Sequence, residues 1–376
     1  MTSQSRMRIL YLFNGDWNWI KQRPHFLAEF LSRTHDVRVV YSITSKRNMT
    51  VRNRVAGMKL IPTVHVPGRF QSPSLYKLDT LVMKLVFSVI ILFVRPDVVW
   101  ISYPELWSCM PRLKSMPVVY DCMDDHLALE ETQGVRAQLS NSEASLVAAA
   151  RAVIVSSSAL GETIERRYYR DRRPVLVRNA FGDEIIPARP QSVRQSGGGR
   201  VWRLGYIGTL NMIDFELLAQ FLHSMPEVEL HLIGPEGDGS IPVLPRTTYY
   251  GAVPHEKLYS LAAGLDCLLV PFKMKERILA ADTTKIYDYI NFGMPIVCVR
   301  YPEVERYAQF VEFYQTPDEF AEVLQRLIAR GFPRKYTEEQ RLAFLEQNSW
   351  AKRAEAVEEV LDNLMMSSAP SRGTHG

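Results

Sequence analysis

Three aspartates and a histidine lie within the six residues DCMDDH, at positions 121–126. The preceding run PVVY is apolar and β-branched, which is typical of a strand that ends where the polar residues begin. Because a carboxylate prefers water to a packed interior, such a cluster indicates a functional site more than a role in packing. A group there could take a proton from a hydroxyl, and we expect Asp124 to be that base, with Asp125 second and His126 third. The alternative is that the cluster caps a helix.

A second group of candidate residues follows the strand-like run LDCLLVPF and a cationic loop. Thr283, Thr284 and Lys285 open a helix there, and Asp288 lies one turn further on. Hydroxyl groups and a lysine at the amino end of a helix suit a diphosphate, and a carboxylate can accept hydrogen bonds from ribose hydroxyls. The alternative is that Asp282 or Thr283 only caps the helix and that Lys285 is solvated.

Glycines mark a strand-to-helix turn in GYIGTLN, residues 205–211. Gly208 and Thr209 would open the helix, whose unpaired backbone N–H groups favour an anion. The alternative is an ordinary tight turn. The spacing differs from the dinucleotide pattern G-x-G-x-x-G, and no acid for a ribose follows at a clear strand end. Hydride transfer with a nicotinamide cofactor is therefore disfavoured.

Aromatic and basic side chains are combined in the segment after the first strand, which contains Trp17, Trp19, Arg23 and His25. Tryptophan faces stack on sugar rings, and an arginine can hold a phosphate or a carboxylate. We expect these four residues to contact an anionic ligand that carries a sugar. The alternative is a tryptophan in the core and an arginine at the start of a helix.

Strand-like and helix-like segments alternate along the chain and would place these candidates at strand ends. RMRILYLFN, PHFLAEFLSRT and VRVVYSI predict a strand, a helix and a strand, and the theme repeats to residue 181. It begins again at residue 201, after the Pro- and Gly-rich segment IPARPQSVRQSGGGR. Ligands bind beyond the carboxyl ends of parallel strands. We therefore expect an α/β protein with two Rossmann-like doubly wound domains that face a cleft.

The length of 376 residues fits two such domains, and a composition with 47% hydrophobic and 23% charged residues is typical of a globular protein. The expected division is an N-terminal domain at 1–185, a linker at 186–199, a C-terminal domain at 200–345, a helix at 346–366 that returns to the first domain, and a disordered tail at 367–376.

The net charge of +4 is distributed unevenly. Residues 1–77 hold 13 Lys and Arg against three acids, a balance of 13 − 3 = +10, so the rest of the chain carries 4 − 10 = −6. The basic segment either is a solvated face or is attracted to phospholipid or nucleic acid. No zinc-finger, RNP or basic-helix pattern supports nucleic acid, so an anionic membrane surface is the expected partner.

The run from Leu85 to Val94 is apolar except for Ser88, and Lys84 and Arg95 bracket it. A membrane-spanning helix needs about 20 apolar residues. We therefore expect either a buried helix or one that lies in a membrane interface.

Four cysteines are widely spaced and form no C-x-x-C pair, which indicates buried core thiols in a reducing compartment. They are Cys109, Cys122, Cys267 and Cys298. The first residues lack the apolar core of a secretory signal, so we expect a cytoplasmic location.

Several segments, in their order and spacing, resemble a GT-B glycosyltransferase, similar to family 4 and to the xanthan-type glucuronosyltransferases of bacterial polysaccharide synthesis. In the first domain they are WNWIKQRPHFLAEFL, VVYDCMDDH, SEASLVAAARAVIVSSSAL and VLVRNAF. In the second domain they are LGYIGTL, LHLIGP, YYGAVPHEKLYSLAAGLDCLLVPF and KIYDYINFGMPIV. NSWAKRAEAV resembles the tryptophan-bearing helix that crosses back to the first domain.

The resemblance implies transfer of a hexosyl or glycuronosyl group from a nucleotide-diphosphate sugar to a glycan acceptor, which we expect to be lipid-linked at the inner face of the cell membrane. It makes the second domain the donor site and the aromatic and basic segment of the first domain the acceptor site. No cofactor is implied apart from the nucleotide sugar as co-substrate. We expect no metal, since D-x-x-D-D matches poorly the D-x-D of metal-dependent transferases.

The chain departs from family 4 at positions that matter. The family has a Glu-x7-Glu pair, and here Ala280 holds the first place and Asp288 the second. The arginine and lysine that usually grip the diphosphate are missing from GTLNMIDFELL, so Lys285 becomes the expected diphosphate contact. Two alternatives follow: a GT-B nucleotide-sugar epimerase, which needs no acceptor, and a binding protein that has lost catalysis.

Overall fold

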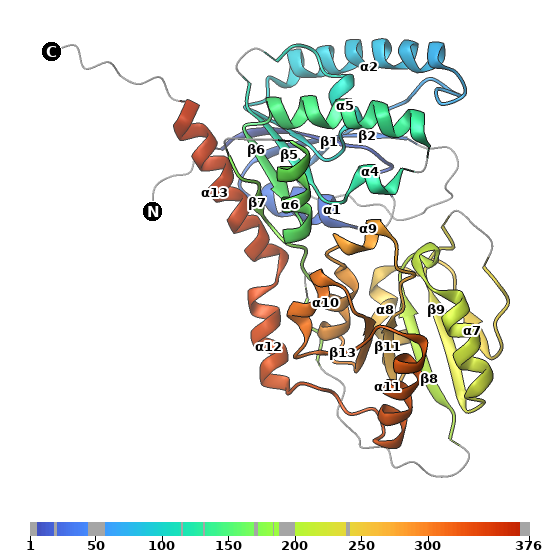
Figure 1. Ribbon diagram of the computed structural model, residues 1–376. Coiled ribbons are helices and arrows are strands. Elements are labelled where there is room, and N and C mark those ends of the chain that lie inside the picture. The colour runs from blue at the N-terminus through green and yellow to red at the C-terminus, as the bar shows by residue number, and fades with distance from the viewer. Residues whose placement is uncertain are drawn as a thin grey trace. The chain divides into compact units, whose positions relative to one another are not determined.

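The computed structural model describes residues 6–18, 21–43, 57–113, 116–130, 132–168, 172–182, 184–187, 200–237 and 241–368 (Figure 1). The chain divides into two compact units, Met1–Arg178 with Trp350–Gly376, and Asn179–Ser349. The second unit thus begins before residue 185, because the Asn179 backbone N–H donates to Asp282 of that unit, at 2.7 Å. Most of the expected linker, 188–199, and the tail from 369 lie outside the described residues.

Seven parallel strands form the sheet of the first unit, in the order β3-β2-β1-β4-β5-β6-β7. The central strands are buried along almost their whole length, as expected for a parallel sheet that is covered on both faces. The strands are β1 (Arg8–Phe13), β2 (Asp36–Ser42), β3 (Lys59–Thr63), β4 (Val98–Ile101), β5 (Val118–Cys122), β6 (Ala152–Val155) and β7 (Val175–Leu176).

Helices flank this sheet and begin at clear signals in the sequence. The longest starts after Ser72, whose hydroxyl accepts the Leu75 N–H at 3.2 Å, with Pro73 in the first helical position. The helices are α1 (Arg23–Leu31), α2 (Pro73–Val94), α3 (Glu105–Ser108), α4 (His126–Leu129), α5 (Gln133–Ala149), α6 (Ser158–Arg167) and α13 (Trp350–Ser368). None of the helices in the described ranges is long and apolar enough to cross a membrane.

The C-terminal helix α13 packs against α1 within the first unit. The Phe26 and Trp350 rings stack with centroids 5.0 Å apart, and Trp350 is 1% exposed. His35 Nε2 lies 2.6 Å from a carboxylate oxygen of Glu358. These contacts explain why residues so far along the chain belong to the first unit.

Six parallel strands form the sheet of the second unit, in the order β10-β9-β8-β11-β12-β13. They are β8 (Trp202–Ile207), β9 (Val228–Ile233), β10 (Thr247–Tyr249), β11 (Cys267–Val270), β12 (Ile296–Val299) and β13 (Val311–Tyr314). The helices are η1 (Leu210–Met212), α7 (Phe215–Ser224), α8 (His255–Ala262), α9 (Glu276–Leu279), α10 (Thr284–Asn291), η2 (Pro302–Tyr307), α11 (Pro317–Ala329) and α12 (Glu338–Gln347).

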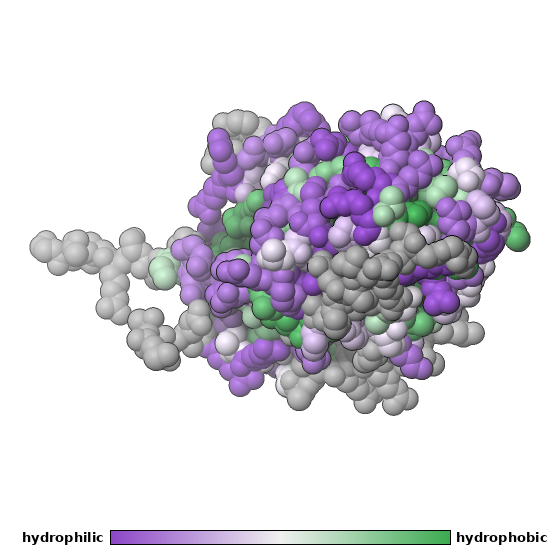
Figure 2. All heavy atoms as spheres, turned by 90° about the horizontal axis from the view of Figure 1, so that it is seen from below, coloured by the Kyte–Doolittle hydropathy of each residue, from purple (hydrophilic) through white to green (hydrophobic). Residues whose placement is uncertain are grey.

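Apolar side chains of the strands and of the helices that flank them make up the cores of both units. All four cysteines are buried and none forms a disulfide, which confirms the prediction of core thiols. Burial raises the pKa of the Cys109 thiol to about 12. On the face of the molecule in Figure 2, hydrophilic residues cover most of the described surface and hydrophobic residues form small, separate areas.

Candidate functional site

Two glycines lie together just after neighbouring strands of the second unit. Gly208 follows β8 and Gly234 follows β9, with φ of 146° and 142°. A Cβ atom at Gly234 would lie 2.2 Å from the Gly208 carbonyl oxygen, so the two backbones approach more closely than any side chain allows. The sequence predicted Gly208 as a donor residue. It missed Gly234, although both glycines end strand-like runs of the same form, GYIG and HLIG.

Substitution of Gly234 by alanine should strongly destabilise the second unit. The new Cβ would clash with the Gly208 carbonyl and would need an unfavourable φ, and the strain alone costs about 1–3 kcal/mol. Gly251→Ala is the matched control, because its φ is 71° and a Cβ there meets nothing within 4 Å. Urea unfolding should show a clearly larger loss of unfolding free energy in Gly234→Ala than in Gly251→Ala. Equal losses in the two variants would contradict this account of the turn.

Lys285 lies across Gly208. A Cβ at Gly208 would be 2.2 Å from Lys285 Cε and 2.9 Å from its Nζ, so the space that this lysine occupies depends on the glycine. The ammonium group also lies 5.6 Å from the ring centroid of Tyr206 and 5.3 Å from that of Phe272. Lys285 is therefore partly buried among the ends of β8 and β11, which does not fit the alternative of a solvated lysine.

The amino end of α10 is fixed by a buried carboxylate. Asp282 accepts hydrogen bonds from the Asn179 backbone at 2.7 Å and from the Tyr287 hydroxyl at 3.2 Å, and it pairs with Arg306. Thr283, the N-cap residue, makes no side-chain capping bond. The Asp282 carboxylate is thus occupied by these partners, and the α10 N-cap has no side-chain capping bond, so the alternative of a plain helix cap does not describe these two residues. Arg306 was not anticipated, because it follows Asp282 by 24 residues in sequence.

The other predicted donor residues lie at the same edge of this sheet. Thr284 begins α10, and Thr209 immediately follows Gly208, where its carbonyl oxygen accepts the Tyr206 hydroxyl at 2.8 Å. Asp288 is partly buried on α10, and its Oδ1 lies 3.4 Å from the Gly182 backbone nitrogen. The second unit therefore gathers a lysine, hydroxyl groups, a carboxylate and a helix amino end, which is a set suited to a nucleoside diphosphate.

The acidic cluster follows β5 in the first unit, and its members differ in environment. Asp124 is exposed. Asp125 caps α4 through Ala128 and places its two oxygens 2.7 and 2.8 Å from Arg167. Burial opposes ionisation of Asp125, but the hydrogen bonds and charge of Arg167 outweigh it and hold its pKa below the usual value. Asp125 is thus engaged in a helix cap and an ion pair, whereas Asp124 is exposed to solvent.

His126 is buried beside Tyr103, with ring centroids 4.8 Å apart. Burial lowers its pKa to about 4, so the imidazole is neutral at pH 7. Within the described part of the chain its Nε2 has no hydrogen-bond partner. A neutral imidazole can accept a proton, so His126 keeps its place behind Asp124 as a candidate base.

The lowered pKa of His126 predicts a loss of stability in acid. In the unfolded state the imidazole has a pKa near 6.5, whereas in the folded state the pKa is about 4. Between these two pH values the unfolded state binds a proton and the folded state does not, so protonation favours unfolding. Stability should fall as the pH drops through this window, by about 2 kcal/mol between pH 7 and 5 from this residue. Denaturant unfolding at both pH values should show a smaller fall in His126→Gln. An identical fall in the two proteins would show that His126 is not the cause.

Three of the four residues predicted to bind an acceptor, Trp17, Arg23 and His25, are buried in the first unit. Arg23 is 3% exposed, pairs with Asp121 at 2.8 Å and donates to the Val177 carbonyl at 2.6 Å. Trp17 is 1% exposed, and His25 Nε2 lies 2.9 Å from its carbonyl oxygen. These contacts do not fit direct acceptor binding, because the polar atoms are already engaged in holding α1 to the sheet. Trp19 lies outside the described residues.

A cavity of about 310 Å³ in the first unit offers a different place for a sugar. Three aromatic side chains and two carboxylates contribute to it, and it adjoins His126 through Tyr103. Its lining includes Phe70, Tyr76, Tyr103, Glu105 and Glu130. The sequence analysis missed this cavity, since its residues come from three separate parts of the chain, 70–76, 103–105 and 130–142. In the described residues no group of His, Cys, Asp or Glu is arranged to hold a metal ion.

Comparisons with known proteins identify the fold. No family model and no curated protein matches the chain. It is similar to sucrose-phosphate synthase from Thermosynechococcus elongatus, with a TM-score of 0.71 and 13% identity over 96% of this chain and 100% of that one. The chain has the GT-B fold. The predicted α/β class with two doubly wound domains is thereby confirmed.

Two further GT-B structures resemble the chain. HepE from Anabaena, in complex with UDP and glucose, has a TM-score of 0.68 and 14% identity, covering 95% of this chain and 100% of its own. The lipopolysaccharide outer core galactosyltransferase WaaB has a TM-score of 0.61 and 14% identity, covering 96% and 100%. At these identities the likeness concerns the fold.

Proposed function

We propose that this GT-B protein is a glycosyltransferase that uses a nucleotide-diphosphate sugar. The observation that carries the proposal is Lys285, held over Gly208 beside the amino end of α10. Glycosyl transfer needs the nucleoside diphosphate to be stabilised as it leaves, and a lysine and a helix amino end supply positive charge where the negative charge develops. Thr283, Thr284 and Thr209 would add hydrogen bonds, and Asp288 would accept them from the ribose.

The acceptor hydroxyl needs a base, and Asp124 is the candidate. It is exposed at the end of β5, whereas Asp125 is committed to Arg167. In an inverting mechanism Asp124 would take the hydroxyl proton while the acceptor oxygen attacks the sugar carbon and the nucleoside diphosphate departs. No metal or cofactor is part of this proposal.

The acceptor sugar would occupy the cavity lined by Tyr103, and not the segment around Trp17. Aromatic faces stack on sugar rings, and the carboxylates of Glu105 and Glu130 can accept hydrogen bonds from sugar hydroxyls. Tyr103→Ala should therefore raise the KM for the acceptor about tenfold through lost stacking, with the KM for the donor unchanged. Steady-state kinetics with each substrate varied in turn would measure both values. Equal changes in both KM values would point to a structural role for Tyr103.

We further propose that the acceptor is a lipid-linked glycan, presented at the cytoplasmic face of the membrane during synthesis of a bacterial surface or extracellular polysaccharide. The +10 charge of residues 1–77 supports attraction to anionic lipid, and WaaB is named for a lipopolysaccharide acceptor. A relationship to family 4 or to the xanthan-type glucuronosyltransferases is part of the same proposal.

The test is a thermal-shift screen against UDP, GDP, ADP and dTDP, since a ligand that binds the folded state raises its melting temperature. We expect one nucleoside diphosphate to stabilise the protein, and UDP is tried first because HepE holds it. The matching sugar nucleotides, incubated with membrane extract, should then release that diphosphate. An isomerised donor without acceptor would instead support an epimerase, and binding without release would support an inactive binding protein.

A further inference from the structure

Helix α2 exposes a broad hydrophobic face to solvent. Seven large apolar side chains on it are between 37% and 79% exposed. They are Leu78, Leu81, Val82, Leu85, Val89, Leu92 and Phe93. Their spacing of three, four and seven residues places them on one side of the helix, and the buried side chains Met83 and Phe87 lie on the other. In Figure 1 this helix, drawn in blue, lies at the top of the first unit. The seven side chains are called the docking face below.

Positive charge borders the docking face. Lys77 and Lys84 are exposed and seven residues apart, so they lie along one edge of it, and the exposed Arg95 ends the helix. The one acid in α2, Asp79, is 1% exposed and accepts hydrogen bonds from the Val66 backbone and from Arg69. The exposed charges of this helix are therefore all positive.

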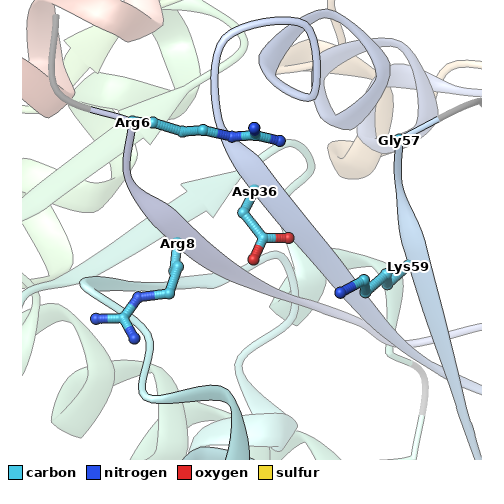
Figure 3. Close-up of a pocket in the computed structure, with 5 residues that line it drawn as sticks. All are labelled: Arg6, Arg8, Asp36, Gly57 and Lys59. Carbon is cyan, nitrogen blue, oxygen red and sulfur yellow. The ribbon is translucent and has the colours of Figure 1, made fainter.

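A second basic group lies at the end of the sheet where α2 terminates. Arg8 pairs with Asp97 at 3.0 Å, which ties the start of β1 to the residues just after α2. Arg6, Arg8 and Lys59 line a cavity of about 390 Å³ with a single carboxylate, Asp36 (Figure 3). Even with Arg8 paired to Asp97, Arg6 and Lys59 leave this group with more positive than negative charge, which extends the positive potential beyond the helix.

We propose that the docking face binds the surface of a bilayer that contains anionic lipids. The apolar side chains would enter the boundary between headgroups and acyl chains, and the lysines at the edge would contact lipid phosphates. This deepens the proposed function, on which it rests, by naming the surface that meets the membrane. Phe70 and Tyr76 of the proposed acceptor cavity adjoin the start of α2, so a sugar on a membrane lipid would be close to that cavity.

A second copy of the chain fits the docking face less well. Self-association through α2 would place exposed apolar side chains together, but it would also bring the lysine edges of two helices near each other. The helix exposes no acid to offset them. Lipid phosphates supply the missing negative charge, whereas a second α2 adds positive charge.

The test is co-sedimentation of the full chain with vesicles of phosphatidylcholine alone or mixed with phosphatidylglycerol, at low and high salt. We expect binding to the mixed vesicles that weakens with salt. Leu85→Glu with Leu92→Glu should abolish it, and Lys77→Gln with Lys84→Gln should weaken it about thirtyfold. The matched controls are Leu342→Glu, a leucine of α12 that is 41% exposed, and Lys257→Gln on α8, and both should bind as the wild type does.

A second measurement reports the position of the helix directly. Leu85→Trp should give fluorescence that shifts to the blue on mixed vesicles and is quenched by brominated lipid. Absence of vesicle binding would overturn the proposal, as would a dimer in sedimentation velocity that Leu85→Glu with Leu92→Glu dissociates. The nucleotide thermal shift should persist in every variant, so its failure would count against the proposed function and not against the docking face.

Discussion

Lys285→Ala should weaken binding of the nucleoside diphosphate about 100-fold and abolish the thermal shift that it causes. A hydrogen bond to a charged group contributes about 1.5–3 kcal/mol, and a factor of 100 corresponds to about 2.7 kcal/mol. The effect should be this large because GTLNMIDFELL, which follows β8, contains no arginine or lysine that could replace it. Isothermal titration calorimetry with the nucleotide selected by the screen measures the change.

Lys335→Ala is the matched control for Lys285→Ala. Lys335 donates to the Val311 carbonyl at 2.9 Å, at the start of β13, and so lies at the opposite edge of the same sheet. The Lys335→Ala substitution removes the same charge from the same unit, and it should leave the affinity for the nucleoside diphosphate within about twofold of the wild-type value. If the two variants weakened binding equally, net charge and not a contact of Lys285 would be responsible.

Asp124→Asn should lower kcat by a factor of about 10²–10⁴, which is the usual contribution of a positioned general base. The amide keeps the shape of the side chain but cannot take the proton of the acceptor hydroxyl. Donor affinity should not change, because the donor residues belong to the other unit. Turnover measured as release of the nucleoside diphosphate, with calorimetry of the same protein, separates the two effects.

Glu165→Gln serves as the control for Asp124→Asn, since Glu165 is exposed on α6 of the same unit. Its turnover should equal that of the wild type. A fully active Asp124→Asn protein would move the base elsewhere, and His126 would then be the next residue to replace. Asp125→Asn is a poorer probe, because it leaves Arg167 without its partner carboxylate and would destabilise the fold.

The fold could be predicted from the sequence because its signals are local. Runs such as IVCV and CLLV are apolar throughout, as buried parallel strands are, and helix starts such as Ser72-Pro73 carry their own caps. The order of these elements then leaves few possible topologies. The same reasoning placed Lys285 and Asp288 on one helix, because their spacing within that helix is fixed.

The candidate site of the first unit could not be predicted in the same way. Arg23 and Asp121 are 98 residues apart, and only the folded chain shows that they form a buried ion pair. Trp17 and His25 follow a strand, as many functional residues do, but here both are buried and their rings lie against each other, with centroids 4.1 Å apart. The residue types at a strand end can therefore indicate a candidate site, but only the folded structure shows whether those side chains are exposed to a ligand or buried in the core.

The close approach of the turns at Gly208 and Gly234 also joins residues far apart in sequence and could not be predicted from it. Gly208 and Gly234 each follow one of two neighbouring strands, and only the pairing of those strands brings the glycines so close that Gly234 has no room for a side chain. Asp282 and Arg306 likewise meet only in the fold, yet they set the position of the α10 amino end. These contacts support the residues that the sequence did indicate.

The central claim is that the diphosphate of a sugar nucleotide binds at the amino end of α10, and a crystal structure of the full chain with the selected nucleoside diphosphate tests it most directly. We expect phosphate oxygens within hydrogen-bond distance of Lys285 Nζ and of the backbone at Thr283 and Thr284, next to Gly208. Density for the nucleotide in the first unit, or a diphosphate more than about 5 Å from Lys285, would contradict the claim.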